Sequence, residues 1–220
     1  MTLRLYYHPL SSYCWKALIA FYEHDIPVDK VMTNLGDAEQ RAALLKLWPI
    51  GKFPVLVDDT RGRTLPESSI IIEYLDMNYA SGPRLVPADP EAALVVRQWD
   101  RFYDLYVHTP MQAIVADRMR PEGKADPFGV AATRARLRGA LDVVETEMAT
   151  RDWAAGATFS MADCAATPAL FYADQVQPFG DTHPVAAAYL ARLKARPSIA
   201  RVIDEAKPYF HMVPMDRAAS

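Results

Sequence analysis

The chain has 220 residues, of which 51% are hydrophobic and 23% charged, and its formal net charge is −3. This composition is typical of a folded protein with a sizeable core and argues against intrinsic disorder. The small negative charge gives no basic field for nucleic acid or an anionic membrane, so an anionic ligand must be held by local groups. The two cysteines, Cys14 and Cys164, exclude a disulfide framework and fit a reducing compartment.

The first residues predict a β-strand and lack the apolar core and the small-residue cleavage site of a signal peptide. No run of about 18 apolar residues occurs, so no transmembrane helix is expected. We therefore expect a cytoplasmic protein that does not associate with membranes.

Strand and helix patterns alternate over the first 79 residues. Leu3, Leu5 and Tyr7 recur at every second position, which is the period of a strand. The further expected elements are a helix after Ser12, a strand at 26–32, a helix at 37–46, strands at 53–57 and 63–65, and a helix from 66. The order β-α-β-α-β-β-α with a parallel crossover predicts an α/β domain.

Residues 80–90 are rich in proline and small residues, which indicates a linker. No convincing strand follows, and apolar residues recur at helical spacing. Pro110 is expected to interrupt the first long helix, and Pro184 and Pro197 to begin two later ones. We therefore predict an α/β domain at 1–79, the linker, and an all-helical domain at 91–220.

Pro54 lies in an otherwise strand-like run, although it lacks the N–H group that a sheet ladder needs. Pro54 is then either an edge proline or the second residue of a cis peptide bond. A cis bond would leave the backbone of Phe53 and Val55 free to pair with an extended peptide. The sequence alone leaves both interpretations open.

Two predicted helix starts carry hydroxyl groups. At one, Glu67 and Ser68 either cap the helix or bind the charged end of an α-amino acid together with free N–H groups. At the other, Ser11 or Ser12 either caps the helix or stabilises an anion with the help of the helix dipole. Cys14 is either a reactive thiol at this helix start or a packed core residue.

The helical half contains a capping box at Phe159, Ser160 and Asp163, which is a folding element. An aromatic stripe through Tyr103 and Tyr106 either belongs to the core or lines an apolar pocket between the domains. The five histidines show no metal-ligand spacing, and no glycine-rich phosphate motif occurs. We therefore expect no metal site.

Taken together, these segments resemble the cytosolic glutathione transferase family over nearly the whole chain. Residues 11–16 (SSYCWK) resemble the helix-opening motif of its serine-type classes, close to that of the zeta enzymes. Residues 49–56 (PIGKFPVL) resemble the segment around its cis-proline, and residues 66–75 (PESSIIIEYL) resemble its most specific motif. Residues 159–163 are similar to its capping box. Four motifs in the right order make the resemblance specific.

The resemblance implies a thioredoxin-like N-terminal domain that binds glutathione as co-substrate, and a helical domain that forms most of the acceptor pocket. It implies a detoxifying transferase in which the glutathione thiol attacks a small apolar electrophile, and the family is typically homodimeric. The implied glutathione contacts are Lys52, Phe53, Pro54, Val55, Glu67 and Ser68, with Pro54 in the cis form. The acceptor-pocket residues proposed with it are Tyr103, Tyr106 and Met111.

Ser11 matches the hydroxyl that stabilises the glutathione thiolate in this family. Tyr7, Ser12 and Cys14 are the alternatives, and Tyr7 resembles the catalytic tyrosine of the tyrosine-type classes. We favour Ser11 because a hydroxyl at a helix start also gains the helix dipole.

The sequence departs from the zeta pattern at Tyr13 and Cys14, and Trp48 stands where asparagine commonly precedes the Pro-x-Gly segment. Two other functions therefore stay open. One is a glutathione-dependent isomerase or thiol reductase in which Cys14 takes part, and the other is a non-catalytic binding protein. The sequence does not identify the electrophile, because its pocket is built from helical side chains that vary between proteins of the same fold.

Overall fold

Four strands near the N-terminus form a mixed sheet in the order β2–β1–β3–β4. The computed structural model describes residues 2–213 of the chain. The strands are β1 (Leu3–Tyr7), β2 (Asp29–Met32), β3 (Val55–Asp58) and β4 (Arg63–Pro66). β1 and β2 are parallel, as the predicted crossover requires, whereas β1–β3 and β3–β4 are antiparallel. This is the predicted thioredoxin-like β-α-β-α-β-β-α arrangement.

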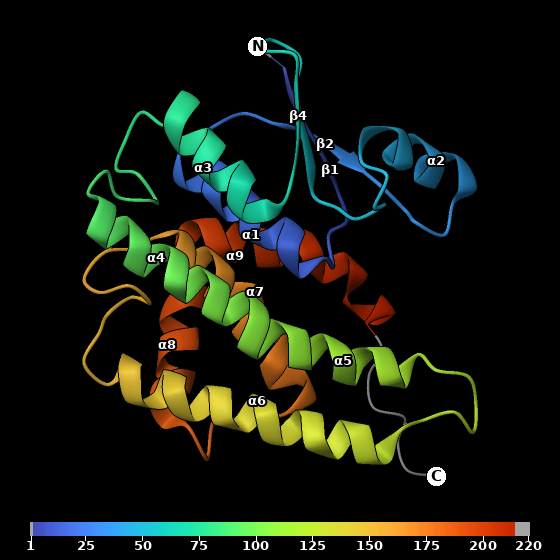
Figure 1. The fold of residues 1–220 in the computed structure, drawn as a ribbon, viewed down its shortest axis with the longest axis vertical. Helices are drawn as coiled ribbons and strands as arrows, with labels where there is room; N and C mark the ends of the chain where they lie inside the picture. The colour runs from blue at the N-terminus through green and yellow to red at the C-terminus, as the bar shows by residue number, and fades with distance from the viewer. Residues whose placement is uncertain (1, 214–220) are drawn as a thin grey trace.

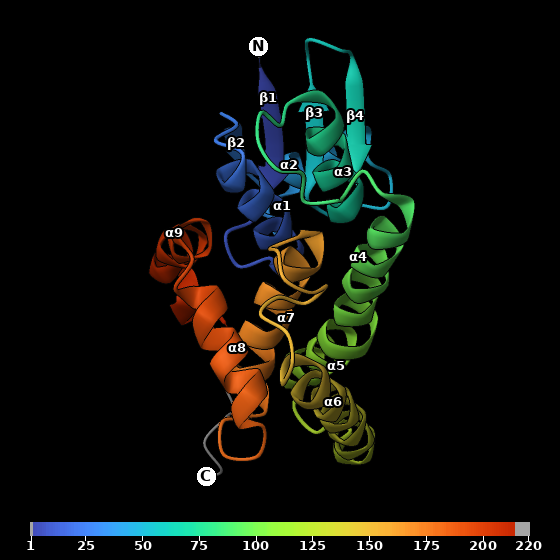
Figure 2. The same ribbon diagram turned by 90° about the vertical axis from the view of Figure 1, so that its left-hand side faces the viewer.

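Three helices accompany the sheet: α1 (Ser12–Glu23), α2 (Ala38–Leu47) and α3 (Ser68–Asn78). α1 lies between the sheet and the helices of the second part of the chain, and it packs against α3, α7 and α9 (Figures 1 and 2). This position explains why nearly every residue of α1 is buried, including Lys16. α2 lies apart from the helical part, and only its Leu44 is buried.

The second part of the described chain is helical, as predicted. Its elements are α4 (Pro90–Phe102), the π-helical turn η1 (Tyr103–His108), α5 (Thr109–Arg118), α6 (Pro127–Met148), α7 (Met161–Val176), α8 (Pro184–Lys194), α9 (Pro197–Ala206) and the 3₁₀ turn η2 (Lys207–Met212). α7 runs through the middle and is buried along most of its length (Figure 2). Pro184 and Pro197 begin helices as expected. No helix in residues 2–213 is long and apolar enough to span a membrane.

The interruption that we expected at Pro110 is a π-helical turn over the six residues that precede α5. Proline has no N–H to donate to the carbonyl of Tyr106, four residues earlier, and its ring would clash with that carbonyl in a regular α-helix. A wider π turn separates the two groups. The Thr109 hydroxyl donates a hydrogen bond of 3.0 Å to the Asp104 carbonyl and satisfies one carbonyl of this turn.

The start of α3 differs from the simple capping interpretation. The helix begins at Ser68, and Glu67 is its N-cap residue with φ 70° and ψ 115°. Glu67 makes no side-chain cap hydrogen bond and Ser68 is the first helical residue, so the interpretation that these two residues cap the helix, with Ser68 as N-cap, is wrong. A non-glycine residue at this φ is strained, and such residues concentrate at functional sites.

The capping box at the start of α7 is confirmed. The Asp163 carboxylate is fully buried and accepts four hydrogen bonds. The donors are the backbone N–H groups of Ala154 (2.8 Å) and Ser160 (2.9 Å) and the hydroxyls of Ser160 (3.0 Å) and Tyr189 (2.6 Å). Asp163 thereby ties the loop before α7 and helix α8 to the start of the central helix.

Replacing Asp163 by alanine should strongly destabilise the protein, because two buried backbone N–H groups and a tyrosine hydroxyl lose their acceptor. We expect the free energy of unfolding in urea to fall by about 3 kcal/mol or more. Asp152→Ala, at an exposed position nearby, is the matched control and should change it by less than about 0.5 kcal/mol. Equal effects of the two substitutions would contradict this role.

Candidate functional site

A cavity of about 180 Å³ lies where the α/β part meets the helical part. Its walls come from the start of α1, the segment before β3, the start of α3 and the junction of α4 with η1. The lining residues are Tyr13, Trp48, Lys52, Phe53, Pro54, Glu67, Ser68, Ser69, Arg101, Asp104 and Leu105. Residues that are distant in the sequence, and that belong to both parts of the chain, therefore share one site.

Most of the side chains predicted to contact glutathione lie in this cavity. Lys52, Phe53, Pro54, Glu67 and Ser68 all line it. The Phe53–Pro54 peptide bond is cis, as the resemblance implied. Val55, which was expected to contribute its backbone, has a fully buried side chain and does not line the cavity.

The start of α1 separates the four candidate hydroxyl and thiol groups. Ser11 is the N-cap of α1, and its hydroxyl accepts a hydrogen bond of 3.4 Å from the Cys14 N–H. Ser12 is buried within the helix, and Tyr7 is half-buried and packs against the core. The capping role considered for Ser11 is therefore present, whereas the cavity itself is lined by Tyr13.

Cys14 is fully buried, and burial raises the pKa of its thiol to about 12. A hydrogen bond from the helix start opposes this shift but does not overcome it. Cys164 is equally buried, its pKa is also raised by burial, and both cysteines are free. Neither thiol is accessible or ionised enough at neutral pH to act as a nucleophile.

A charge cluster closes the cavity from the side of the helical part. Lys16 on α1 is fully buried, and its Nζ lies 2.6 Å from Asp100 Oδ1 and 2.8 Å from Asp104 Oδ2. It also donates a hydrogen bond of 2.8 Å to the Ser69 hydroxyl, which in turn donates one of 2.9 Å to Asp100 Oδ2. The cluster thus connects α1, α3, α4 and η1. Burial is the largest influence on Asp104 and raises its pKa, although Lys16 opposes the shift.

Arg101 completes this cluster on the cavity side. Its Nη2 donates hydrogen bonds of 2.7 Å to Ser69 Oγ, 2.8 Å to Asp100 Oδ2 and 2.9 Å to Asp104 Oδ2. The side chain is 54% exposed and lines the cavity, although its Nε and Nη2 atoms are anchored by Asp100, Asp104 and Ser69. Two cations, Lys52 and Arg101, and two acids, Glu67 and Asp104, therefore surround the same space, which suits a ligand carrying charges of both signs.

Tyr13 packs edge-on against His108, with ring centroids 4.4 Å apart and an angle of 66° between the rings. Burial raises the pKa of Tyr13, and the Asp104 carboxylate adds to the shift, so the phenol remains protonated at neutral pH. His108 is 2% exposed, and neither ring nitrogen has a hydrogen-bond partner among residues 2–213. Burial, with the nearby Lys16 charge, lowers the pKa of His108 to about 3.

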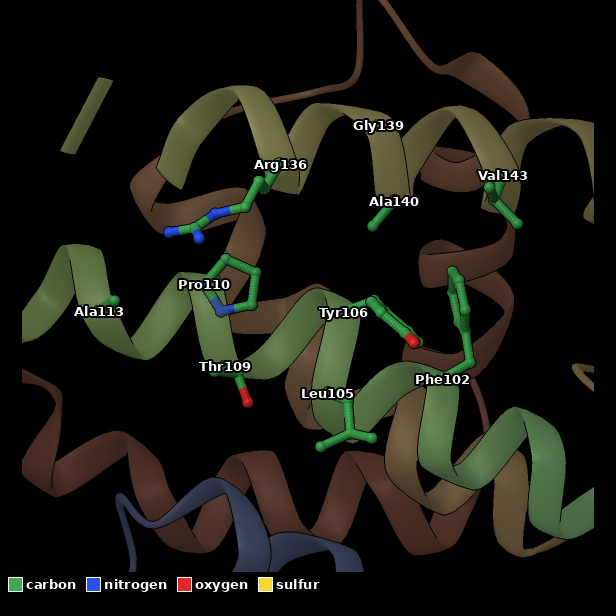
Figure 3. A pocket seen from close by; sticks show the side chains of 10 residues that line it. All are labelled: Phe102, Leu105, Tyr106, Thr109, Pro110, Ala113, Arg136, Gly139, Ala140 and Val143. Carbon is green, nitrogen blue, oxygen red and sulfur yellow. The ribbon is translucent and has the colours of Figure 1, made fainter. Parts of the chain in front are cut away.

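A second, more open cavity of about 500 Å³ lies between η1–α5 and α6 and is mainly apolar. Figure 3 shows Phe102, Tyr106 and Pro110 on one side and Ala140 and Val143 on the other. No residue of the α/β part lines this groove.

The three residues expected in the acceptor pocket are not brought together by the structure. Only Tyr106 lines a cavity, the groove of Figure 3, and it is 60% exposed. Tyr103 and Met111 are 0% and 2% exposed and belong to the core, because they lie on the face of the long helix that packs against α7.

Sequence reasoning missed the contribution of the helical part to the interdomain cavity. Two signals were available: a lysine, Lys16, inside the apolar stripe of α1, and the sequence Asp100-Arg101 followed by Asp104 on a long helix. Charges four residues apart share a helix face, and a buried lysine needs acidic partners. Within the described residues, no cluster of histidine, cysteine or acidic side chains has the geometry to hold a metal ion.

Comparisons with known proteins agree with this architecture. Residues 5–84 match the family model "Glutathione S-transferase, N-terminal domain", and residues 127–192 match "Glutathione S-transferase, C-terminal domain". "Glutathione S-transferase F10" of Arabidopsis thaliana is 30% identical over 182 residues, covering 80% of this chain and 83% of that protein. "Glutathione S-transferase U9" of Arabidopsis thaliana and "Glutathione S-transferase" of Pseudomonas putida are 31% and 32% identical, covering 52% of this chain in each case and 47% and 50% of those proteins.

Solved structures are similar over almost the entire chain. A glutathione S-transferase from Methylobacillus flagellatus KT, solved with glutathione bound, has a TM-score of 0.84 and 29% identity, covering 91% of this chain and 98% of that one. A glutathione S-transferase from Methylobacterium radiotolerans, in complex with glutathione sulfonate, has a TM-score of 0.80 and 26% identity, covering 100% of this chain and 98% of that one. This chain belongs to the glutathione S-transferase family.

The buried, neutral His108 should make stability depend on pH. The unfolded chain binds a proton at this histidine below about pH 6.5, whereas the folded protein resists protonation down to about pH 3. The contribution of His108 to the free energy of unfolding is therefore fully present above about pH 6.5. Below that pH it falls by up to about 1.4 kcal/mol per pH unit.

His108→Phe keeps a ring against Tyr13 and removes this titration. Urea unfolding of both proteins between about pH 7 and pH 4.5 should show a smaller acid-induced loss of stability in the variant. Parallel pH profiles of the two proteins would contradict a buried neutral imidazole.

Proposed function

We propose that the protein is a glutathione transferase, which binds glutathione in the interdomain cavity and activates its thiol for attack on a small apolar electrophile. One observation carries the proposal: the cavity of a glutathione S-transferase family member is lined by Lys52, Glu67, Arg101 and Asp104. Glutathione is a small peptide with two carboxylates and one ammonium group, so its charges complement this lining. The proposed setting is detoxification in the cytoplasm.

In this proposal the γ-glutamyl end of glutathione binds at the start of α3. Ser68 lines the cavity at the first helical position, where backbone N–H groups and the helix dipole favour a carboxylate. Glu67 binds the ammonium group. Lys52, an exposed residue of the lining, binds the glycyl carboxylate. The cysteinyl backbone pairs with the segment of Phe53 and Val55 that flanks the cis-proline.

The sulfur of the ligand then lies beside the start of α1. The thiol releases its proton to solvent, and the Ser11 hydroxyl donates a hydrogen bond to the resulting thiolate. The positive end of the helix dipole lowers the thiol pKa further. The thiolate lone pair forms the new C–S bond, and the leaving group departs with the electrons of the bond that breaks. Holding glutathione beside the electrophile converts an encounter in solution into a reaction within one complex.

This assignment makes the protein a serine-type transferase with a zeta-like helix opening. Tyr7 is the weaker alternative because it lies on β1 and lacks the helix dipole that Ser11 gains at the start of α1. Neither Tyr7 nor Ser11 is among the residues that line the cavity. The domains proposed are the glutathione-binding unit at 1–79, the linker at 80–90 and the helical unit at 91–220, of which residue 1 and residues 214–220 lie outside the described part. Leu105 and Tyr13 are the lining residues best suited to contact the apolar acceptor.

The full burial and raised pKa of Cys14 argue against a thiol reductase that uses this residue. A non-catalytic binding protein would bind glutathione with a similar affinity but would not lower its thiol pKa. Measuring the thiolate absorbance of bound glutathione near neutral pH therefore separates a binding protein from a transferase.

Ser11→Ala should lower turnover with a reactive aryl halide by about 10²–10³ and reduce the thiolate absorbance of bound glutathione, because one donor to the developing anion is lost. Ser11→Ala also removes the N-cap of α1, which should lower the free energy of unfolding by about 1 kcal/mol. Urea unfolding measures this effect separately from turnover. Tyr7→Phe and Cys14→Ala are the controls and should alter turnover much less. A large loss in Tyr7→Phe, with Ser11→Ala active, would place the protein in a tyrosine-type class.

We also propose that the protein is a homodimer whose interface includes the apolar groove of Figure 3. Figures 1 and 2 show α3, α4 and α6 on the same side of the molecule. These helices and the turn η1 carry exposed apolar residues: Ile70 and Met77 on α3, Leu94 on α4, Leu105 and Tyr106 on η1, and Val143 on α6. Exposed apolar side chains on neighbouring elements, three of which line one apolar groove, are typical of an interaction site. A second copy is the occupant proposed, because the groove contains none of the groups proposed to bind glutathione and shares only Leu105 with the interdomain cavity.

Tyr106→Glu should convert the proposed dimer into a monomer, because it places a charge in the middle of an apolar interface. Light scattering coupled to size-exclusion chromatography at micromolar concentration measures the mass. Phe128→Glu, which alters an 86% exposed residue outside the groove, should remain dimeric. A monomeric wild-type protein, or a dimeric Tyr106→Glu, would refute this interface.

A further inference from the structure

The guanidinium of Arg101 has one edge anchored and one edge available. Its Nε donates a hydrogen bond of 3.2 Å to Asp100, and its Nη2 donates to Ser69, Asp100 and Asp104. Nη1 has no hydrogen-bond partner in the described part of the chain. Because Arg101 lines the same cavity as Ser68, its available N–H groups are accessible to a bound molecule.

The anchor is rigid because its members are buried. The side chains of Asp100 and Asp104 are 2% and 10% exposed and are also held by Lys16. An arginine fixed in this way loses little rotamer freedom when a ligand binds, so more of the hydrogen-bond energy is available for affinity. An unanchored surface arginine would have to be ordered first.

The Ser69 hydroxyl links Arg101 to the first turn of α3. It accepts hydrogen bonds from Arg101 Nη2 (2.7 Å) and from Lys16 Nζ (2.8 Å). Ser69 directly follows Ser68, so the guanidinium of Arg101 is held beside the N-terminus of α3. An anion at this helix start meets two favourable groups: the free N–H groups of the helix and a planar cation suited to a carboxylate.

We propose that Arg101 binds the α-carboxylate of the γ-glutamyl residue of glutathione. The helical part then contributes directly to recognition of the peptide, and not only to the acceptor side. This inference rests on the proposed function, because it takes glutathione as the ligand. It assigns Arg101 to the γ-glutamyl carboxylate at the start of α3 and leaves the glycyl carboxylate to Lys52.

Isothermal titration calorimetry with two peptides tests the assignment. Glutathione carries both carboxylates, whereas γ-glutamylcysteine, taken as its C-terminal amide, carries the γ-glutamyl carboxylate and no second one. Arg101→Gln should weaken the binding of both peptides by about tenfold or more, the effect of losing a hydrogen bond to a charged group. Lys52→Gln should weaken the binding of glutathione but leave that of γ-glutamylcysteine within about twofold.

Arg97→Gln is the matched control. Arg97 lies one turn earlier on α4, is similarly exposed at 47%, and pairs with Glu73 outside the cavity. The Arg97→Gln variant should bind both peptides with the affinity of the wild-type protein. Circular dichroism and thermal melting check the fold of each variant. If Arg101→Gln does not fold, Arg101→Lys keeps the positive charge beside Asp100 and Asp104 but lacks the planar fork, and it should bind both peptides several-fold more weakly.

The outcomes separate this inference from the proposed function. Wild-type affinity in a folded Arg101→Gln or Arg101→Lys overturns the role of Arg101 while glutathione binding stands. Weakened binding of glutathione only, with γ-glutamylcysteine unaffected, overturns the assignment to the γ-glutamyl carboxylate. A wild-type protein that binds neither peptide overturns the proposed function itself.

Discussion

The position of Lys16 constrains much of the molecule. A lysine ammonium group inside a buried helix has lost its hydration, and leaving it without acidic partners would cost about 3–5 kcal/mol. Its partners come from other elements: Asp100 from α4, Asp104 from η1 and Ser69 from α3. The docking of the α/β part on the helical part brings these partners to Lys16. The ion pairs thus specify the docking geometry more than they add net stability.

The interdomain cavity follows from this docking. The same contacts that satisfy Lys16 bring Arg101 and Asp104 into one cavity with Glu67 and Ser68, although the two pairs lie in different parts of the chain. The π-helical turn before Pro110 contributes Asp104, which contacts Lys16, and His108, which packs on Tyr13. An irregular turn that results from a proline therefore forms one wall of the site.

The sequence predicted features that lie within one short segment, but not those that depend on contacts between distant segments. The cis bond at Pro54 and the capping box at Asp163 lie in short contiguous motifs, and the structure contains both. The strained φ of Glu67 was not predicted, because a serine in the first turn looks like an ordinary cap. The role of Arg101 depends on packing between segments about 30 and 85 residues apart, a distance that periodicity does not cover. For the same reason the aromatic stripe did not reveal that Tyr103 faces the core while Tyr106 faces solvent.

The central claim is that glutathione binds between the two parts of the chain with its sulfur at the start of α1. A crystal structure of the protein with glutathione tests this claim most directly. The account predicts the γ-glutamyl residue at Glu67, Ser68 and Arg101, and the sulfur within hydrogen-bond distance of the Ser11 hydroxyl. Glutathione bound in the apolar groove of Figure 3, or in the interdomain cavity with its sulfur directed away from Ser11, would contradict it.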